Sequence, residues 1–445
     1  MRAGRGRQET RQSSARAHAL GLAGRIVAIA AGICAVAGAA GAASAGAVVL
    51  HLPGATISYL PPPGMRAPQS GAEGNAKPDV SKLLEYHGGP VMPSNTDYAL
   101  YWDPAGAPVY PAGYEAGIDR WFEDLAHDSG GVQNTDSVLT QYKDAAGETA
   151  SYDVHFAGAL VDTDAYPANG CSAAPICFTE EQLRSEIAAF VESNKLPSDL
   201  QHEYFLLTPP GVESCFEAAG HSCSDGTKHA TYCAYHGYIT VGTGVIVYAN
   251  NPYVAGLNCE PGEEHPNDNP SDATIAGGLA HEHSESVTDP ELTAWYDVKG
   301  DEVADKCRTF KQATEFGEPL GKAPDGANYN QVINGDLYWY QQEWSNEAGG
   351  CEQRSAQPPT VTKVTPKSGP TTGKTVVTVT GSNFAAPATV RFNGNLATEV
   401  TVKSSKSISA VSPPGAAGIV DVTVTTSTGS SPITKKDHFT YKTAK

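Results

Sequence analysis

The stretch Leu279-Ala-His-Glu-His-Ser-Glu-Ser-Val-Thr-Asp-Pro290 places an imidazole and two carboxylates at helical spacing. Residues four apart on an α-helix lie above one another, so His281 and Glu285 can face the same way. Glu282 follows His281 by one position and therefore lies about 100° further round the helix. This arrangement can hold one cation between His281 and Glu285 while Glu282 reaches a water molecule on it.

The pattern resembles the His-Glu-x-x-His helix of zincin metallopeptidases, with Glu285 in place of the second histidine. The resemblance implies that Glu282 is the catalytic base and that His281 and Glu285 are metal ligands. A carboxylate in place of an imidazole adds negative charge around the ion, which weakens it as a Lewis acid and favours harder cations. We therefore expect a divalent metal as cofactor, with Zn²⁺ as the leading candidate and Mn²⁺ or Ca²⁺ as alternatives.

A third metal ligand is expected from the acidic segment after this helix. Gluzincin-like enzymes take a glutamate from an element further along the chain, and here Glu302 follows Glu285 by 17 residues and Asp305 follows it by 20. Either carboxylate could complete the metal set, and the other could orient His281 as a hydrogen-bond acceptor. Cys307, if it forms a disulfide, would hold this segment in place.

The same region predicts a helix over residues 272–288. His283 belongs to its core-facing stripe, so we expect a hydrogen-bonded core histidine there rather than a ligand. Gly277 and Gly278 each destabilise a helix by about 1 kcal/mol, and close approach of a strand or substrate would explain them. The stripe consists of Ile275, Leu279, His283 and Val287.

Other catalytic or ligating candidates are less specific. Three histidines in Cys-rich, loop-like sequence could bind a metal, but their spacing favours none of them: His229, His236 and His265. The sequence contains no G-x-S-x-G motif, and no cysteine is expected to be free. These observations argue against a serine or cysteine nucleophile.

The N-terminal sequence predicts a secretory leader over residues 1–45. Six arginines precede an uncharged run over residues 26–50, which contains the small-residue site Ala43-Ser44-Ala45. A retained anchor is the alternative, since such a run can span a bilayer, but its richness in Ala and Gly favours cleavage. Residues 46–80 are rich in Pro, Gly and Ala without periodicity, which predicts a flexible linker.

Charge and cysteine content agree with export. Without the six arginines and one glutamate of the leader, the chain has 24 basic and 48 acidic residues, a net charge of −24. Such a surface repels nucleic acid and anionic lipid, so we expect neither as a partner, apart from a membrane contact through an uncleaved leader. Eight cysteines follow the leader and none forms a C-x-x-C pair, which predicts up to four disulfides rather than a thiolate zinc site. Cys171–Cys177 and Cys307–Cys351 are plausible closures, and the full pairing stays open.

Residues 81–355 predict a disulfide-bonded α+β domain, zincin-like or α/β, because strands and helices interleave. We expect helices over residues 114–126 and 180–193, and strands over 96–102, 203–208 and 238–248, the last with a possible hairpin bend at its glycines. The region resembles bacterial relatives of the exordium/phosphate-induced family of secreted proteins. The resemblance rests on Tyr86-His-Gly-Gly-Pro90, Tyr98-Ala-Leu-Tyr-Trp102, Tyr248-Ala-Asn-Asn-Pro-Tyr253 and the His281–Pro290 block followed by Trp295-Tyr-Asp297. It implies secretion and a compact domain; plant members lack the His-Glu pair and have no established enzymatic activity.

Residues 356–445 predict an all-β immunoglobulin-like sandwich, because short alternating runs of Val and Thr are separated by turn residues such as Asn393-Gly394. Val364-Thr-Pro-Lys-Ser-Gly-Pro370, Thr378-Val-Thr-Gly-Ser-Asn-Phe384 and Val420-Asp-Val-Thr-Val424 resemble the IPT/TIG family. The resemblance implies a spacer or adhesive module.

Together these patterns predict a secreted, metal-dependent hydrolase with a C-terminal IPT/TIG module. Its partner would be an extracellular peptide or protein, or a cell-wall polymer. The alternative is a non-catalytic cell-wall or adhesion protein with a structural metal or none.

Overall fold

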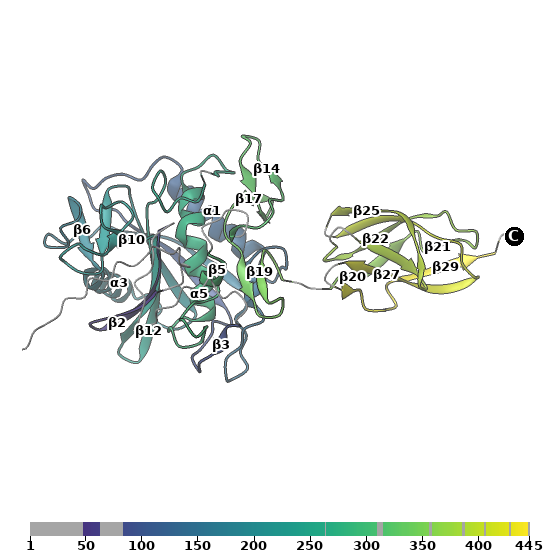
Figure 1. The fold of residues 1–445 in the computed structure, drawn as a ribbon, viewed down its shortest axis with the longest axis horizontal. Helices are drawn as coiled ribbons and strands as arrows, with labels where there is room; N and C mark the ends of the chain where they lie inside the picture. The colour runs from purple at the N-terminus through teal and green to yellow at the C-terminus, as the bar shows by residue number, and fades with distance from the viewer. Residues whose placement is uncertain are drawn as a thin grey trace, which may run out of the picture. The chain divides into compact units, whose positions relative to one another are not determined.

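The computed structural model describes residues 48–62, 83–262, 264–308, 315–355, 358–384, 388–404, 406–426 and 429–443. The predicted leader lies outside these residues. Two parts of the chain are described separately below, the N-terminal domain (residues 48–355) and the C-terminal domain (residues 358–443) (Figure 1). Among the described residues, no helix combines the length and apolarity that crossing a membrane requires.

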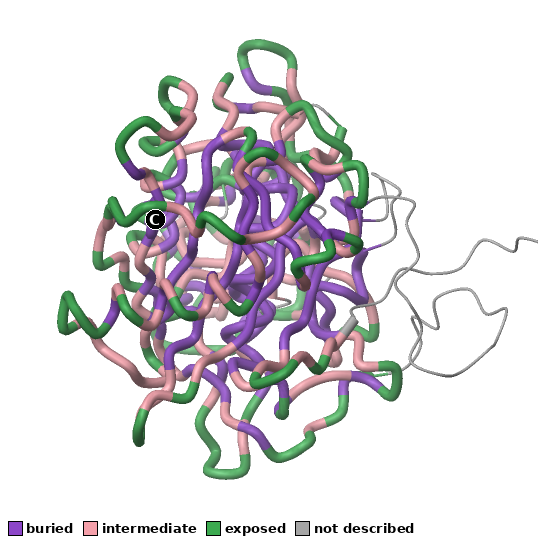
Figure 2. Tube along the Cα trace, turned by 90° about the vertical axis from the view of Figure 1, so that its left-hand side faces the viewer, coloured by how far each residue is buried: buried purple, intermediate pink, exposed green. Residues whose placement is uncertain are grey.

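A seven-stranded mixed sheet forms the centre of the N-terminal domain, and Figure 2 shows much of the interior trace as buried. Four neighbouring strands run parallel, whereas β11 is antiparallel to β12 and β2 is antiparallel to β11. The buried central strands match the apolar runs of the sequence. In sheet order the strands are β1 (Val48–Leu52), β2 (Ala55–Leu60), β11 (Ala234–Val241), β12 (Gly244–Pro252), β7 (His202–Thr208), β4 (Asn95–Trp102) and β5 (Val154–Asp162).

Two amphipathic helices cover opposite faces of this sheet, because successive side chains of a strand point to opposite sides. α1 (Tyr114–His127) packs its apolar stripe with Phe205 and Leu207 of β7. α3 (Glu180–Asn194), which begins with a capping box at Thr179, packs with Tyr204 and Leu206 of the same strand. Both helices confirm the predictions for residues 114–126 and 180–193, and β11 with β12 forms the predicted hairpin.

Apart from the helical stretch over residues 271–288 and the 3₁₀ helix η2 (Asp305–Cys307), the rest of the N-terminal domain consists of short elements, so the domain is mostly β structure with few helices. These elements are α2 (Asp136–Leu139), the four-stranded sheet of β10 (Ala230–Tyr232), β9 (Cys223–Ser224), β8 (Val212–Cys215) and β6 (Ile176–Thr179), and the pairs β13 (Trp295–Tyr296) with β3 (Glu85–Tyr86), β14 (Gly321–Lys322) with β15 (Asn328–Tyr329), β16 (Gln331–Ile333) with β17 (Asp336–Tyr338), and β18 (Glu343–Ser345) with β19 (Gly350–Glu352).

The hairpin β1–β2 lies within residues 46–80, for which the sequence predicts a flexible linker. That prediction is wrong for residues 48–60, which form two paired strands. The alternation of apolar and polar residues in Ile57-Ser-Tyr59 fits a strand. The linker prediction missed it because it rested on the Pro, Gly and Ala content of the whole segment. Pairing with β11 supplies the backbone partners that an isolated hairpin lacks.

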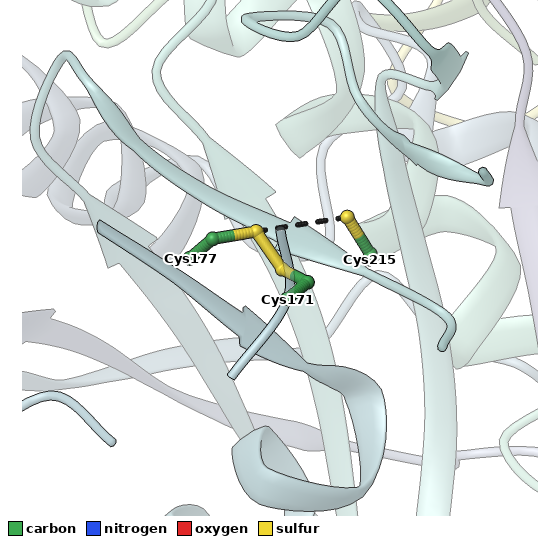
Figure 3. Close-up of side chains that lie close together, drawn as sticks. All are labelled: Cys171, Cys177 and Cys215. Atoms are coloured by element: carbon green, nitrogen blue, oxygen red, sulfur yellow. Dashed lines mark hydrogen bonds between the residues drawn. A yellow bond between two sulfur atoms is a disulfide. The ribbon is translucent and has the colours of Figure 1, made fainter. Parts of the chain in front are cut away.

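Eight cysteines form four disulfides in the N-terminal domain, as the even count and their spacing predict. Figure 3 shows the Cys171–Cys177 disulfide with Cys215 beside it. The Cys215 sulfur lies 3.6 Å from the Cys177 sulfur. These three sulfurs lie close enough to hold a metal, but each belongs to a disulfide, so none is available as a thiolate ligand. The pairs are Cys171–Cys177, Cys215–Cys223, Cys233–Cys259 and Cys307–Cys351. Such a set is consistent with an extracellular protein.

We expect the disulfides to contribute unequally to stability, because closing a longer loop removes more entropy from the unfolded chain. Cys307–Cys351 spans 44 residues and Cys171–Cys177 spans 6. The double variant C307S/C351S should lose about 4 kcal/mol of unfolding free energy and the matched control C171S/C177S about 2 kcal/mol. Urea unfolding of both variants measures the difference, and an equal loss would contradict the loop-length argument.

The C-terminal domain is the β-sandwich predicted for this part of the chain. Its two sheets enclose a core that includes Val377, Phe392 and Phe439. Asn393 and Gly394 have φ angles of 46° and 83°, as a type I′ hairpin requires. One sheet contains β20 (Thr360–Thr365), β22 (Val376–Ser382), β26 (Ser407–Val411) and β25 (Thr398–Ser404); the other contains β21 (Ser368–Pro370), β29 (His438–Lys442), β27 (Gly418–Thr426), β23 (Thr389–Phe392), β24 (Asn395–Leu396) and β28 (Gly429–Ser430).

Candidate metal centre

The helix predicted over residues 272–288 is present, with a wider turn in its middle. It consists of α4 (Ser271–Thr274), the π-helical turn η1 (Ile275–Leu279) and α5 (Ala280–Thr288). A Cβ atom on Gly278 would lie 2.6 Å from Ala234 Cβ, at the start of β11, and one on Gly277 would lie 2.8 Å from the Cys259 carbonyl oxygen. Gly278 therefore allows the close approach of a strand, as predicted, whereas Gly277 allows the approach of the loop that contains Cys259.

His281 points a free ring nitrogen towards Glu285. The Gln341 amide donates to the Ala304 carbonyl at 2.8 Å, so its oxygen faces His281 Nδ1 at 3.0 Å and accepts the ring proton. In the neutral ring, this bond leaves Nε2 as the nitrogen with a lone pair, 3.1 Å from Glu285 Oε1 and 3.4 Å from Asp305 Oδ1. An outer hydrogen bond of this kind commonly fixes the ring of a metal-binding histidine.

His236, from the middle of β11, supplies a second imidazole to the same cluster. Its Nδ1 lies 3.1 Å from Glu282 Oε2 and 3.6 Å from Glu285 Oε2, and its Nε2 lies 3.7 Å from Glu302 Oε1. The sequence analysis names His236 only among three undistinguished candidates. Its contact with residues 46 or more positions away depends on tertiary packing, and no local spacing signals it.

Glu302 and Asp305 both reach the cluster, but they make different contacts. Asp305 Oδ2 accepts the Glu302 backbone N–H at 2.9 Å, and the Asp305 N–H donates to Glu285 Oε1 at 3.2 Å. Both Glu302 carboxylate oxygens lack a hydrogen bond within the described part of the chain. Glu302 is therefore the freer candidate ligand, whereas Asp305 orders the loop and faces His281. The Cys307–Cys351 disulfide follows directly and anchors this loop.

The candidate ligands form two overlapping groups, His236 with Glu285 and Glu302, and His281 with Glu282 and Glu285. Within each group the ligand atoms lie no more than 4.8 Å apart. All five side chains are at most 2% exposed. Several of their polar atoms make no hydrogen bond to any described residue: His236 Nε2, His281 Nε2, Glu282 Oε1, Glu302 Oε1 and Glu302 Oε2. Buried polar groups without partners are rare in folded proteins.

The carboxylates of the cluster outnumber the two imidazoles that can carry a positive charge. The pKa values of several of these groups are shifted as a result. Burial, followed by the nearby Asp305 carboxylate, raises the pKa of Glu285 well above its usual value. Burial and then Glu285 do the same to the pKa of Glu302. Burial alone would lower the pKa of His281, but the carboxylates of Asp305 and Glu282 outweigh it and raise that pKa to about 9. A divalent cation at this place would relieve the repulsion between the carboxylates.

His283 lies on the other side of α5 and has carboxylate partners of its own, as a core histidine should. Its Nε2 is 3.3 Å from Asp97 Oδ2 and its Nδ1 is 3.2 Å from Asp136 Oδ1. Asn95 donates to Asp97 at 2.8 Å and orients that carboxylate. Burial by itself lowers the pKa of His283, but Asp97 and Asp136 outweigh it and raise the pKa well above the usual value. These contacts agree with the prediction of a core histidine with polar partners, and its exclusion from the metal ligands stays a prediction.

We expect His283→Gln to destabilise the fold without removing metal binding, whereas His281→Gln removes metal binding. Breaking a buried charged pair costs about 3 kcal/mol or more. Because the folded-state pKa of His283 is raised, its contribution is complete below about pH 6.5 and disappears as the pH rises through the folded-state pKa. Urea unfolding at several pH values, with metal analysis of both variants, checks this. A His283→Gln protein of normal stability without metal would contradict the assignment.

Comparison with known proteins identifies the C-terminal domain. Residues 359–441 match the model of the IPT/TIG domain family, which confirms that prediction. No match to a curated protein was found. The exordium-like and zincin-like resemblances of the N-terminal domain remain predictions.

The similar solved structures share only a small part of their length with this chain. An auxiliary nutrient binding protein from Bacteroides thetaiotaomicron is 19% identical over 19% of this chain and 21% of its own, with a TM-score of 0.17. SGBP-B from a xyloglucan utilization locus in Bacteroides uniformis is 19% identical over 24% of this chain and 28% of its own, with a TM-score of 0.18. The plexin A4 extracellular region is 22% identical over 19% of this chain and 9% of its own, with a TM-score of 0.18.

Proposed function

We propose that this protein is a secreted, metal-dependent hydrolase of peptide or similar acyl bonds. One divalent ion would be held by His236, His281, Glu285 and Glu302, and Glu282 would be the general base. The observation that carries the proposal is the convergence of buried imidazoles and carboxylates from three separate elements, with lone pairs that no described residue uses. A metal ion explains why these costly groups are buried together.

Two imidazoles and two carboxylates favour a borderline cation over a hard one. Glu285 by itself would shift the metal preference towards harder ions, but His236 supplies the nitrogen ligand that the helix lacks. Imidazole ligands suit Zn²⁺ and carboxylates are also compatible with Mn²⁺, whereas Ca²⁺ prefers six or more oxygen ligands. We therefore propose Zn²⁺ first and Mn²⁺ second.

The chemistry follows from the residue types. A divalent ion bound here would lower the pKa of a water molecule and polarise a carbonyl oxygen. Glu282, with its Oε1 free of hydrogen bonds to described residues, would accept one proton from the water that attacks the carbonyl carbon. It would return that proton to the leaving nitrogen as the C–N bond breaks. The products are a carboxylate and an amine, so one water is consumed for each bond cleaved.

A second candidate function is non-catalytic, with the metal serving only to stabilise an adhesion protein. One observation favours it: the candidate ligands are at most 2% exposed, so a substrate cannot reach them in this state. A structural metal site is closed, whereas a catalytic one keeps an open position. In both proposals the IPT/TIG domain serves as a spacer or an adhesive module, with an extracellular protein or a cell-wall polymer as the partner.

Variants of the base and of a ligand separate the two functions. Glu282→Gln should keep one metal ion per chain and lose at least about 100-fold in hydrolysis, since it removes only the base. His236→Ala should lose metal and activity together, because one nitrogen ligand disappears. Elemental analysis and cleavage of an unstructured fluorescent polypeptide measure both, with the chain ending at residue 355 as a control for the IPT/TIG domain. Metal binding in the wild type without cleavage of any polypeptide, under conditions that open the site, would favour the structural role.

A further inference from the structure

The N-terminal hairpin covers the sheet edge beside the candidate metal centre. β2 pairs antiparallel with β11, and in this register Ser58 stands opposite His236. Without the hairpin, β11 would be the last strand of the sheet as far as the chain is described. The hairpin therefore occupies a strand edge that carries one of the candidate ligands.

The contact at this edge is close and specific. Ser58 is fully buried, and its hydroxyl lies beside the Glu302 carboxylate without the geometry of a full hydrogen bond. A Cβ atom on Gly237 would lie 3.1 Å from both Ile57 Cγ2 and the Thr56 carbonyl oxygen. Glycine at this position of β11 therefore allows the backbone of β2 to approach closely.

The side chains of β2 alternate between two environments. Ile57 and Tyr59 join the hydrophobic core that also contains residues of α3, and the Tyr59 ring lies 5.1 Å from that of Phe216. Ser58, between them, points to the other face of the strand and stands opposite His236 of the candidate metal centre. Along β11, this strand therefore has a small residue, Ser58, at the candidate metal centre and a bulky apolar residue on each side of it, Ile57 and Tyr59.

Hydrogen bonds from α3 also hold the hairpin in place. Its only covalent link to the rest of the domain is the polypeptide backbone. Arg184 of α3 donates to the carbonyl oxygens of Gly54 at 3.0 Å and Pro53 at 3.4 Å, at the turn between β1 and β2. Residues 48–82 contain no cysteine, and residues 61–82 are rich in Pro, Gly and Ala. A cut in residues 63–82 would leave the hairpin attached by non-covalent contacts alone.

We propose that β11 is the strand along which an extended polypeptide substrate binds, and that residues 48–60 occupy this place as an autoinhibitory segment. This inference rests on the proposed metal-dependent hydrolysis. Strand addition gives affinity through backbone hydrogen bonds and selectivity through alternate side-chain positions. The favoured substrate has a small residue opposite His236 and bulky apolar residues on either side of it. Removal of the hairpin accounts for how a centre that is closed in this state admits a substrate.

The test uses the chain without residues 1–45, in which residues 70–75 are replaced by the recognition sequence of a site-specific protease. The protein is loaded with Zn²⁺, cleaved, and separated from the released hairpin by size-exclusion chromatography. We expect cleavage of an unstructured fluorescent polypeptide to begin only after release, and a synthetic peptide of residues 48–62 to inhibit it again. Transfer of Zn²⁺ to a chromogenic chelator, measured before and after release, reports access to the centre independently of hydrolysis.

A point variant tests the same contact if the cleaved protein does not stay folded. Gly237→Ala adds a methyl group whose two nearest neighbours, Ile57 and the Thr56 carbonyl, belong to the hairpin, with the Tyr248 hydroxyl next at 3.3 Å. It should therefore loosen the hairpin and raise hydrolysis and Zn²⁺ transfer about tenfold in the intact chain. Gly350→Ala is the matched control, because a Cβ atom there has nothing within 4 Å. It should leave both rates unchanged.

The outcomes distinguish this inference from the proposed function. Equal hydrolysis by intact and cleaved protein would overturn the autoinhibitory role and leave the hydrolase intact. Faster Zn²⁺ transfer and binding of the 48–62 peptide, without hydrolysis of any polypeptide, would support the strand-binding site and refute catalysis. A cleaved protein that unfolds, with Gly237→Ala no faster than Gly350→Ala, would show that the hairpin is a permanent part of the sheet and refute the inference.

Discussion

The close packing of η1 and α5 against β11 is the contact on which the candidate centre depends. Gly278 has no side chain, so Ala234 of β11 can lie directly against the helix. Two residues further along the strand, His236 reaches the carboxylates of Glu282 and Glu285. A larger residue at position 278 would push the strand away and separate the two imidazoles. The glycine pair, which lowers the stability of an isolated helix, is thus a requirement of the tertiary arrangement.

The two sides of α5 deal with buried charge in different ways. On one side, a single imidazole, His283, lies at ion-pair distance from the carboxylates of Asp97 and Asp136, and Asn95 donates a hydrogen bond to Asp97. On the other side, carboxylates outnumber imidazoles and several lone pairs have no partner among the described residues. Uncompensated charge in a protein interior is strongly unfavourable. The groups of three ligand atoms that lie within 4.8 Å of one another occur on this second side of the helix, and this geometry is the reason for placing the cation there.

The burial of the centre connects the metal proposal with the position of the N-terminal hairpin. The candidate ligands are at most 2% exposed, while the strand that carries His236 is paired along its outer edge with residues 57–60. In the proposed mechanism, release of this strand opens the site from the edge of the sheet and breaks the core contacts of Ile57 and Tyr59. The hairpin's contacts with α3 and with the aromatic core show what such a release has to overcome.

The sequence alone determined the local features of this protein. Periodicity identified α1, α3 and the helix over residues 272–288, and turn chemistry and recurrent motifs identified the IPT/TIG sandwich. Cysteine count and spacing predicted up to four disulfides, and the structure supplied their full pairing. The sequence also placed His281, Glu282 and Glu285 on one helix, because their spacing is fixed by helical geometry. Only the tertiary structure brought His236 to them and gave Glu302 and Asp305 different contacts, since strand pairing and loop packing join residues far apart in the chain. Composition suggested a linker over residues 48–60, but pairing with β11 makes these residues a hairpin. The sequence of a strand does not specify which distant strand it will pair with.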